Sequence, residues 1–371
     1  MCPRLLMVVG ARPNFVKVAP VAHALARTGE VETALLHTGQ HYDRNLSEAF
    51  LEQLDLPSPD FYLGVGSGTH AEQTAGVLTG TERVLREHQF DAVLVAGDVN
   101  STLGAALAAA KLQVLVIHLE AGLRSGDWTM PEEVNRVLTD RLSDLLLCPN
   151  RNDVDNLVAE GIAPDRIEVV GNTMIDSLFR LESAAADRGA VERLGLAGAG
   201  FILVTLHRPT LVDDIGLLTT TLHVLGSLGG ALPVIFPVHP RTRARLGDQA
   251  NRGSLVRLLD PLDYLDFIGV MRAARLVITD SGGVQEETSA IGVPCLTYRT
   301  RTERPITVEA GTNRLVGLDP RSLRTACEEV LSHPPPTDRP QIPLWDGMAG
   351  HRAAQVIAGL LSASGSTGRS V

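Results

Sequence analysis

The chain has 371 residues, of which 44% are apolar and 20% are charged, a balance that suits folded domains with substantial cores. Its length exceeds that of one ordinary core and predicts two domains of about 150–200 residues each. The net charge of −10, from 33 Lys and Arg against 43 Asp and Glu, argues against non-specific binding to nucleic acid or anionic membranes. The absence of a signal-peptide pattern and of an apolar run of about 18–20 residues predicts a cytoplasmic protein without a membrane span.

The four cysteines, Cys2, Cys148, Cys295 and Cys327, are far apart and form no C-x-x-C pair. This spacing argues against a disulfide framework or a zinc site. We therefore expect buried thiols in a reducing compartment.

Short apolar runs alternate with helical periodicity along the chain. In the first half the runs cover residues 5–9, 33–36, 92–96, 114–117, 145–148 and 167–170, and in the second half 201–206, 233–238, 255–259, 276–279 and 294–298. Such alternation predicts right-handed crossovers and a parallel, doubly wound sheet in each half. The Ala- and Gly-rich residues 182–200 are expected to connect the halves. Residues 350–361 are expected to form a helix, and residues 362–371 a disordered tail.

Two carboxylates stand where buried strands end. Asp98 follows the run 92–96, and Glu120 follows the run 114–117. Ligands of open α/β sheets bind at the carboxyl ends of the strands, so both side chains are expected beside a ligand. The alternative is that they cap helices or hold loops.

A third acidic pair opens the next helix, where Pro131 precedes Glu132 and Glu133. Adjacent helical residues point about 100° apart, so only one of the two can face a cleft squarely. We interpret Glu132 as the functional acid and Glu133 as structural. Glu132 also stands four residues before Arg136, which leaves an ordinary helix ion pair as the alternative.

Two glycine turns are candidate anion sites. The first, Gly10, precedes Arg12 and Lys17, whose cationic groups would supplement the backbone N–H groups of a helix start. The alternative is an ordinary turn with two solvated cations. The Gly10 turn matches neither a dinucleotide fingerprint nor a Walker loop.

The second glycine turn follows the run 276–279 and contains Ser281, Gly282 and Gly283. Ser281 is a plausible helix N-cap, and the glycines would let an anion approach the backbone. Glu287, nearly two turns into the helix, is placed to reach a neutral polar group such as a ribose diol. Favourable placement of acids near a helix N-terminus is the competing explanation.

Further polar groups follow other strands of the second half. His207 and Arg208 suit a pyrophosphate leaving group through charge and proton donation, whereas a lone His239 is more often structural. Residues 298–305 form either a solvated loop or a nucleotide contact, and His41 is ambiguous. Neither convincing metal-ligand spacing nor a nucleophile motif is present.

Taken together, these segments closely resemble the non-hydrolysing UDP-N-acetylglucosamine 2-epimerase family. The matching segments lie in order along residues 5–317: 10–20, 38–43, 97–102, 120–124, 131–136, 171–176, 280–287 and 302–305. The resemblance implies the GT-B fold, with two Rossmann-like doubly wound parallel-sheet domains facing a central cleft. The expected boundaries are 1–180 for the acid/base domain, 181–345 for the UDP-binding domain, and 346–361 for a helix that packs back on the first domain.

The resemblance also implies a reaction, the reversible conversion of UDP-GlcNAc into UDP-ManNAc. UDP is eliminated to leave a 2-acetamidoglucal and then added back, with no cofactor and no metal. The implied catalytic residues are Asp98, Glu120, Glu132 and His207. The implied substrate-binding residues are Arg12, Lys17, Arg208, Phe267 against the uracil, Ser281, Gly282, Gly283, Glu287 at the ribose, Arg299, Thr302 and Glu303.

Departures from the family pattern bear on regulation and on the sugar. Some members of the family are activated by a second UDP-GlcNAc, the effector, bound beside the active site. Contacts with this effector or with the sugar are expected at Gln40, His41, Arg136 and His239. Asp43, Ser67 and Gly68 replace longer polar residues of the family's effector site, which argues against this activation. The alternatives are a related UDP-amino sugar as substrate, a hydrolysing 2-epimerase, a GT-B glycosyltransferase, and a non-catalytic nucleotide-sugar-binding protein. A homodimer is expected from the resemblance alone.

Overall fold

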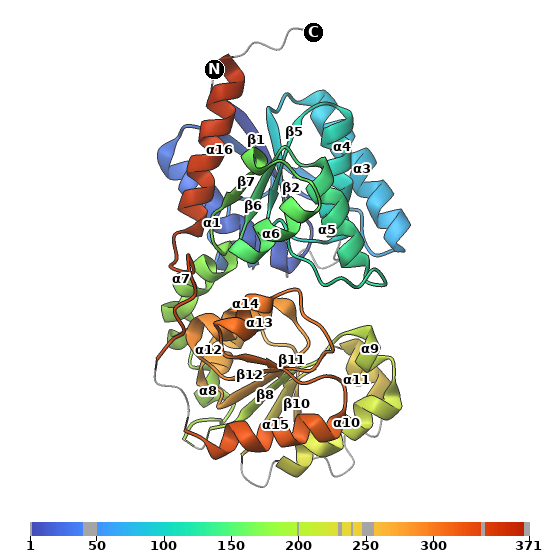
Figure 1. Ribbon diagram of the computed structural model, residues 1–371, viewed down its shortest axis with the longest axis vertical. Coiled ribbons are helices and arrows are strands. Elements are labelled where there is room, and N and C mark those ends of the chain that lie inside the picture. The colour runs from blue at the N-terminus through green and yellow to red at the C-terminus, as the bar shows by residue number, and fades with distance from the viewer. Residues whose placement is uncertain are drawn as a thin grey trace. The chain divides into compact units, whose positions relative to one another are not determined.

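The computed structural model describes residues 2–39, 50–198, 200–228, 232–238, 240–246, 256–334 and 338–366. The chain divides into two compact units (Figure 1). Unit 1 consists of Met1–Ser177 and Pro343–Val371, and unit 2 of Leu178–Ile342.

Unit 1 is built on a seven-stranded sheet in which every neighbouring pair of strands is parallel. Its order is β3 (Phe61–Tyr62), β2 (Glu32–His37), β1 (Arg4–Val9), β4 (Ala92–Ala96), β5 (Leu115–Leu119), β6 (Leu145–Cys148) and β7 (Ile167–Val169). All five residues of β4 are buried, as expected for a central strand that is covered on both faces.

The helices of unit 1 follow the strands in the alternation that the sequence predicted. They are α1 (Arg12–Thr28), α3 (His70–Glu87), α4 (Asn100–Lys111), α5 (Pro131–Leu142), α6 (Arg151–Ala159), the start of α7 (Thr173–Asp187) and α16 (Ala349–Ser366), with a short 3₁₀ turn at Pro164–Arg166. Figure 1 shows α16 lying along α1. A Cβ atom on Gly350 would lie 2.5 Å from Pro20, so this close approach of the two helices requires glycine.

Unit 2 contains a six-stranded parallel sheet in the order β10 (Val256–Leu259), β9 (Val234–Pro237), β8 (Ile202–Thr205), β11 (Leu276–Thr279), β12 (Cys295–Thr297) and β13 (Asn313–Leu315). Its helices are the rest of α7, α8 (Ala190–Arg193), α9 (Pro209–Val212), α10 (Ile215–Leu228), α11 (Pro240–Leu246), α12 (Tyr264–Ala273), α13 (Gly282–Ile291), α14 (Pro305–Glu309) and α15 (Pro320–Ser332). Its core is apolar and centred on β8, β9 and β11.

The two sheets share one winding, in which strand order reverses beside the first strand of each unit. In unit 1 the reversal lies between β1 and β4, and in unit 2 between β8 and β11. Diverging crossovers leave a crevice at such a switch point, outside the carboxyl ends of the strands. Asp98 follows β4, and Ser281 follows β11. Candidate residues of both units therefore lie at these points.

Several sequence predictions need correction. Strands β3 and β13 were missed because they are only two and three residues long and partly exposed. The unit boundary lies inside α7 rather than within residues 182–200, since this helix continues without a break past Ser177. Residues 362–366 were predicted as disordered tail but continue α16, because each added residue of an established helix gains a backbone hydrogen bond.

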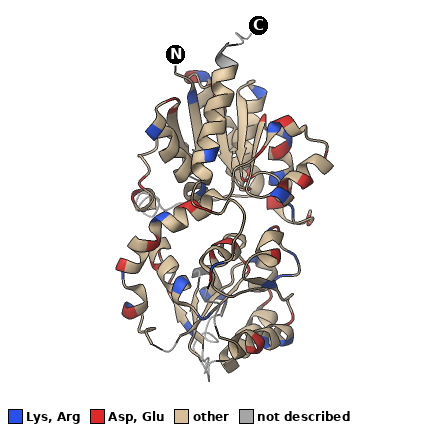
Figure 2. Cartoon of the chain, turned by 60° about the vertical axis from the view of Figure 1, so that its left-hand side comes forward, with Lys and Arg blue, Asp and Glu red and all other residues tan. Residues whose placement is uncertain are grey.

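Charge and cysteine distribution complete the description. Figure 2 shows that acidic and basic residues are spread over the helices of both units. Cys148, Cys295 and Cys327 are buried as predicted, and burial raises the pKa of each thiol. Cys2 is exposed, contrary to the prediction, because it precedes the first strand.

Candidate functional site

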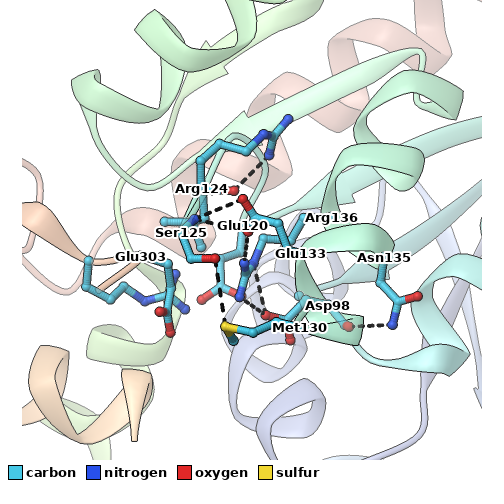
Figure 3. A network of polar contacts seen from close by, with 12 residues as sticks. Asp98, Glu120, Arg124, Ser125, Met130, Glu133, Asn135, Arg136 and Glu303 are labelled. Atoms are coloured by element: carbon cyan, nitrogen blue, oxygen red, sulfur yellow. Dashed lines mark hydrogen bonds and ion pairs between the residues drawn. The ribbon is translucent and has the colours of Figure 1, made fainter. Parts of the chain in front are cut away.

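Asp98 lies at the carboxyl end of β4 and is paired with a buried arginine of α5 (Figure 3). The Arg136 guanidinium donates to Oδ2 of Asp98 from Nε at 3.1 Å and from Nη2 at 2.8 Å. The Asn135 side chain donates to the backbone carbonyl of Asp98 at 2.9 Å. Because Arg136 is only 2% exposed, its expected role as a free effector or sugar contact gives way to that of a partner of Asp98.

Glu120 follows β5 and lies against the ammonium group of Lys17, which comes from α1. Both side chains are buried. Glu120 has a φ of 72°, a left-handed conformation that costs a non-glycine residue about 1–3 kcal/mol. Such strain concentrates at functional sites. Gly97 permits the arrangement, since a Cβ there would lie 2.9 Å from Lys17 Nζ and 3.2 Å from Glu120 Oε2.

The two adjacent acids of α5 have separate environments, as the sequence predicted. Glu133 is 1% exposed, accepts from the backbone N–H of Ser125 and Gly126, and pairs with Arg136. It therefore holds the loop before the helix. Glu132 is partly exposed and forms no hydrogen bond or ion pair within the described residues. Arg136 pairs with Asp98 and Glu133, so the alternative ion pair between Glu132 and Arg136 is not formed.

The first glycine turn is closed by the side chain of Asn14. Asn14 accepts from the backbone N–H of Gly10 and Ala11 at 3.2 and 3.0 Å and donates to the carbonyl of Ala96 at 2.8 Å. Arg12 is exposed, and its guanidinium lies 5.5 Å from the Phe50 ring centre. Of the two predicted phosphate ligands, only Arg12 is accessible, because Lys17 is buried against Glu120.

In unit 2, Asp280 organises the carboxyl ends of β8 and β11. Its Oδ2 accepts from the backbone N–H of His207 at 2.9 Å and of Arg208 at 2.8 Å, and its Oδ1 lies 2.9 Å from Nδ1 of His207. Burial alone would raise the pKa of Asp280, but the hydrogen bond and charge of His207, with the backbone donors, outweigh burial and lower it. The His207 side chain is 57% exposed. The carboxylate thus orients an accessible imidazole whose Nδ1 faces Asp280.

The start of α13 carries the second glycine turn. Ser281 is the N-cap residue, but its side chain makes no capping hydrogen bond, contrary to expectation. The backbone N–H groups of Gly282 and Gly283 form no hydrogen bond within the described part of the chain. Such open N–H groups, together with the helix dipole, favour an anion.

A buried ion pair lies beside this helix start. Glu303 accepts from Arg299 at 2.7 and 3.3 Å, and its Oε1 is 3.6 Å from Arg208 Nη2. A Cβ on Gly282 would approach Glu303 Oε1 to 2.6 Å, so any side chain there would displace the Glu303 carboxylate. The arginines offset the carboxylate charge next to the anion site.

Glu287, on the same helix, is 4% exposed and accepts from the Tyr264 hydroxyl at 2.7 Å. Burial raises the pKa of Glu287 to about 7, with the tyrosine hydrogen bond acting in the opposite direction. Phe267 lies on α12 with Tyr264 and is half-buried. Thr302 donates to the side chain of Gln285 at 2.6 Å, which ties the loop of residues 298–305 to α13.

Three expected contacts, Gln40, His41 and His239, lie outside the described residues. Within the described part of the chain, no group of three or more His, Cys, Asp and Glu is placed to hold a metal ion. None of the described helices has both the length and the apolar character needed to cross a membrane.

Sequence reasoning missed Asp280, Tyr264 and Asn14 as functional positions. Asp280 carries the signal that identified Asp98 and Glu120, a carboxylate directly after an apolar strand. Tyr264 and Asn14 give no such signal, because their partners, Glu287 for Tyr264 and the Ala96 carbonyl for Asn14, lie far away in the sequence.

Two cation-paired carboxylates, Asp98 and Glu120, at the ends of neighbouring strands β4 and β5, and an open helix N-terminus with a His-Arg pair at the switch point of unit 2, are typical of a two-domain α/β protein of the GT-B type with a site suited to an anion. The family model for UDP-N-acetylglucosamine 2-epimerase matches residues 23–358. A Methanocaldococcus jannaschii protein named UDP-N-acetylglucosamine 2-epimerase is 38% identical over 364 residues, 95% of this chain and 98% of its own length.

Two further comparisons agree. A crystal structure of the M. jannaschii UDP-GlcNAc 2-epimerase in complex with UDP-GlcNAc and UDP has a TM-score of 0.88, with 96% of this chain and 99% of that chain covered. A Pseudomonas aeruginosa UDP-2,3-diacetamido-2,3-dideoxy-D-glucuronate 2-epimerase is 44% identical over 322 residues, 85% of this chain and 88% of its own. The chain belongs to the UDP-N-acetylglucosamine 2-epimerase family, and it is an isomerase.

Proposed function

We propose that the chain is a non-hydrolysing 2-epimerase that interconverts UDP-GlcNAc and UDP-ManNAc. A carboxylate removes the proton from C2, and the electrons of that bond form a C1=C2 double bond. The C1–O bond breaks, and its electrons leave with the diphosphate of UDP. UDP then adds back to the bound 2-acetamidoglucal while C2 receives a proton on the opposite face.

The C2 proton is weakly acidic, so this elimination requires a placed base and a stabilised leaving group. Asp98, Glu120 and Glu132 are the acid/base groups of this proposal. The pairing of Asp98 with Arg136 and of Glu120 with Lys17 supports it, because each carboxylate is held at a strand end by its own cation. Glu132, which has no such partner among the described residues, is free to exchange protons with substrate or water.

Unit 2 supplies the leaving-group and nucleotide contacts in this proposal. The N–H groups of Gly282 and Gly283 and the guanidinium of Arg208 bind the diphosphate, with Ser281 beside them, and His207 stabilises the departing charge. Glu287 binds the ribose, and Phe267 lies against the uracil. Arg299, Thr302 and Glu303 shape the loop next to the diphosphate, and Arg12 adds a further cation.

The single observation that carries the proposal is the pair of cation-bound carboxylates at the ends of β4 and β5. The test is incubation with UDP-GlcNAc in D₂O, followed by NMR. We expect UDP-ManNAc carrying deuterium at C2, with substrate and product reaching a constant ratio. Accumulation of free ManNAc with UDP would identify a hydrolysing enzyme instead, and an absolute need for an acceptor sugar would identify a glycosyltransferase.

A second candidate substrate is UDP-2,3-diacetamido-2,3-dideoxy-D-glucuronate. It is favoured by the 44% identity to the P. aeruginosa enzyme, which exceeds the 38% to the M. jannaschii enzyme. The chemistry at C2 is the same, so the carboxylate roles are unchanged. Parallel D₂O incubations with both sugar nucleotides distinguish the two, because the true substrate should have the higher kcat/KM by at least tenfold.

A cytoplasmic location and a homodimer complete the proposal. Light scattering on the purified chain tests the dimer, and fractionation of the cells that produce it tests the location. Contacts of Gln40, His41 and His239 with an effector or the sugar are tested by measuring whether added UDP-GlcNAc accelerates the reverse reaction.

A further inference from the structure

A buried histidine lies behind the acid cluster of unit 1. His118, on β5 two residues before Glu120, is fully buried. Its Nδ1 lies 2.6 Å from Oδ1 of Asp140, on α5, and its Nε2 lies 2.9 Å from the backbone carbonyl of Gly97. No step of the proposed reaction uses this pair.

Both ring nitrogens of His118 face oxygen atoms, one of the Asp140 carboxylate and one of the Gly97 carbonyl, so the imidazole links these two groups. Burial would raise the pKa of Asp140, but the charge and hydrogen bond of His118, with those of Arg124, outweigh burial and lower it. Arg124 Nη1 is 2.7 Å from Oδ2 of Asp140, and its other nitrogens pair with Glu160. The His118–Asp140 pair is therefore held by the Gly97 carbonyl on one side and by Arg124 on the other.

The His118–Asp140 pair is connected to the three segments that carry Asp98, Glu120 and Glu132. Gly97, whose carbonyl accepts from His118, directly precedes Asp98. The Gly122 N–H, two residues after Glu120, donates to Oδ2 of Asp140 at 3.2 Å. Asp140 itself belongs to α5, the helix whose first turn contains Glu132.

We propose that the His118–Asp140 pair is a positioning device that sets the separation of Asp98, Glu120 and Glu132, an inference that rests on the proposed epimerase function. Inversion at C2 needs proton donors and acceptors on opposite faces of one carbon, so their spacing is part of the chemistry. Misplacement by about 1 Å can cost 10²-fold in rate. Arg136 and Lys17 hold the carboxylate groups, whereas His118 and Asp140 hold the backbone segments from which they extend.

Two substitutions separate the two bonds of the imidazole. The amide of His118→Gln can donate near the former Nε2 position, toward Gly97, but loses Asp140. The shorter amide of His118→Asn can donate near the former Nδ1 position, toward Asp140, but loses Gly97. Leu25→Ala is the control, because it removes packing from the buried face of α1 without touching the pair.

The expected result is a split between kcat and binding. His118→Asn should lower kcat for C2 epimerisation about 100-fold and His118→Gln about 10-fold, while KM and the Kd for UDP change less than twofold, since all the proposed diphosphate ligands except Arg12 belong to unit 2. Misplaced acids should also release more 2-acetamidoglucal per turnover. Leu25→Ala should lower Tm while leaving kcat and glucal release unchanged.

The inference is wrong if folded His118→Asn keeps kcat within threefold of the wild type, or if Leu25→Ala, with a similar fall in Tm, loses as much kcat as His118→Asn does. A reversed order, with His118→Gln the more damaged, would also overturn it. Should both variants fail to fold, Asp140→Asn replaces them, because Asn still lets a neutral His118 donate to Gly97, and the same criteria apply. If the wild type itself exchanges no C2 hydrogen, the proposed function has failed, which is a separate outcome.

Discussion

Replacing Asp280 by Asn tests whether a buried carboxylate acts through His207. The Asn oxygen can still accept from the backbone N–H groups of His207 and Arg208, which lie 2.9 and 2.8 Å from Oδ2 of Asp280. Its NH₂ group then faces Nδ1 of His207, which must become an acceptor. The substitution therefore keeps the fold of the loop while it moves the ring proton to Nε2 and removes the countercharge.

The size of the loss in kcat follows from the solvent exposure of Asp280 and His207. A hydrogen bond to a charged partner contributes about 1.5–3 kcal/mol. Asp280 is buried, but His207 is 57% exposed, so water replaces part of the lost stabilisation and the lower half of that range applies. We expect kcat to fall about 10- to 50-fold, which corresponds to about 1.4–2.3 kcal/mol in the activation barrier.

The assay is a double-mutant cycle on the rate of C2 deuterium incorporation. Because Asp280 is inferred to act through the imidazole, Asp280→Asn should add little to the loss caused by His207→Asn. UDP affinity, measured by calorimetry, should fall less than threefold in both. Wild-type kcat in Asp280→Asn, or losses that multiply in the double variant, would refute this reasoning.

Three other perturbations have distinct expected outcomes. Lys17→Met leaves Glu120 as a buried carboxylate without its cation and should lower the free energy of unfolding by about 3–5 kcal/mol. Adding Glu120→Gln should restore at least half of the lost free energy of unfolding, measured by urea denaturation. No recovery would contradict the pairing of Lys17 with Glu120. Glu132→Gln should lower kcat at least 100-fold with Tm unchanged, whereas Glu133→Gln should lower stability by about 2 kcal/mol, because it weakens charged hydrogen bonds. Equal Tm values for these two variants would contradict the division of roles.

The third perturbation uses pH. The native pKa of Glu287 is raised from 4.5 to about 7, so the folded state holds the proton more tightly than the unfolded chain does. Between those pH values the free energy of unfolding should fall as pH rises, by on the order of 3 kcal/mol relative to Glu287→Gln. Parallel slopes of wild type and variant in urea denaturation at pH 4.5–7.5 would count against this assignment.

The strand-end rule explains why much of the site could be predicted from sequence. Asp98 and Glu120 were identified because a buried parallel strand has an apolar run and its ligand edge has a polar residue. The same rule would have identified Asp280, which follows β11. Both parts of the rule are local and need no knowledge of tertiary contacts. The apolar runs alone therefore also located nearly all the central strands.

The short edge strands β3 and β13 were beyond such a rule. With two and three residues they are too short for a period-2 pattern, and they pair only because a longer neighbour offers its edge. The positive φ of Glu120 was equally hidden, since nothing local distinguishes it from an ordinary residue in extended conformation.

Cation roles were the least predictable part of the site, for an electrostatic reason. Lys17, Arg136 and Arg299 were all expected to contact the ligand, yet each is buried against a carboxylate, namely Glu120, Asp98 or Glu303. A buried charge requires a partner, and a sequence does not state which of several acids is nearest. In unit 2 the backbone N–H groups of Gly282 and Gly283, which form no hydrogen bond within the described part of the chain, are therefore the principal candidates for diphosphate binding. Helix amides provide this attraction without a mobile counter-ion, so they can bind UDP before and after the C1–O bond breaks.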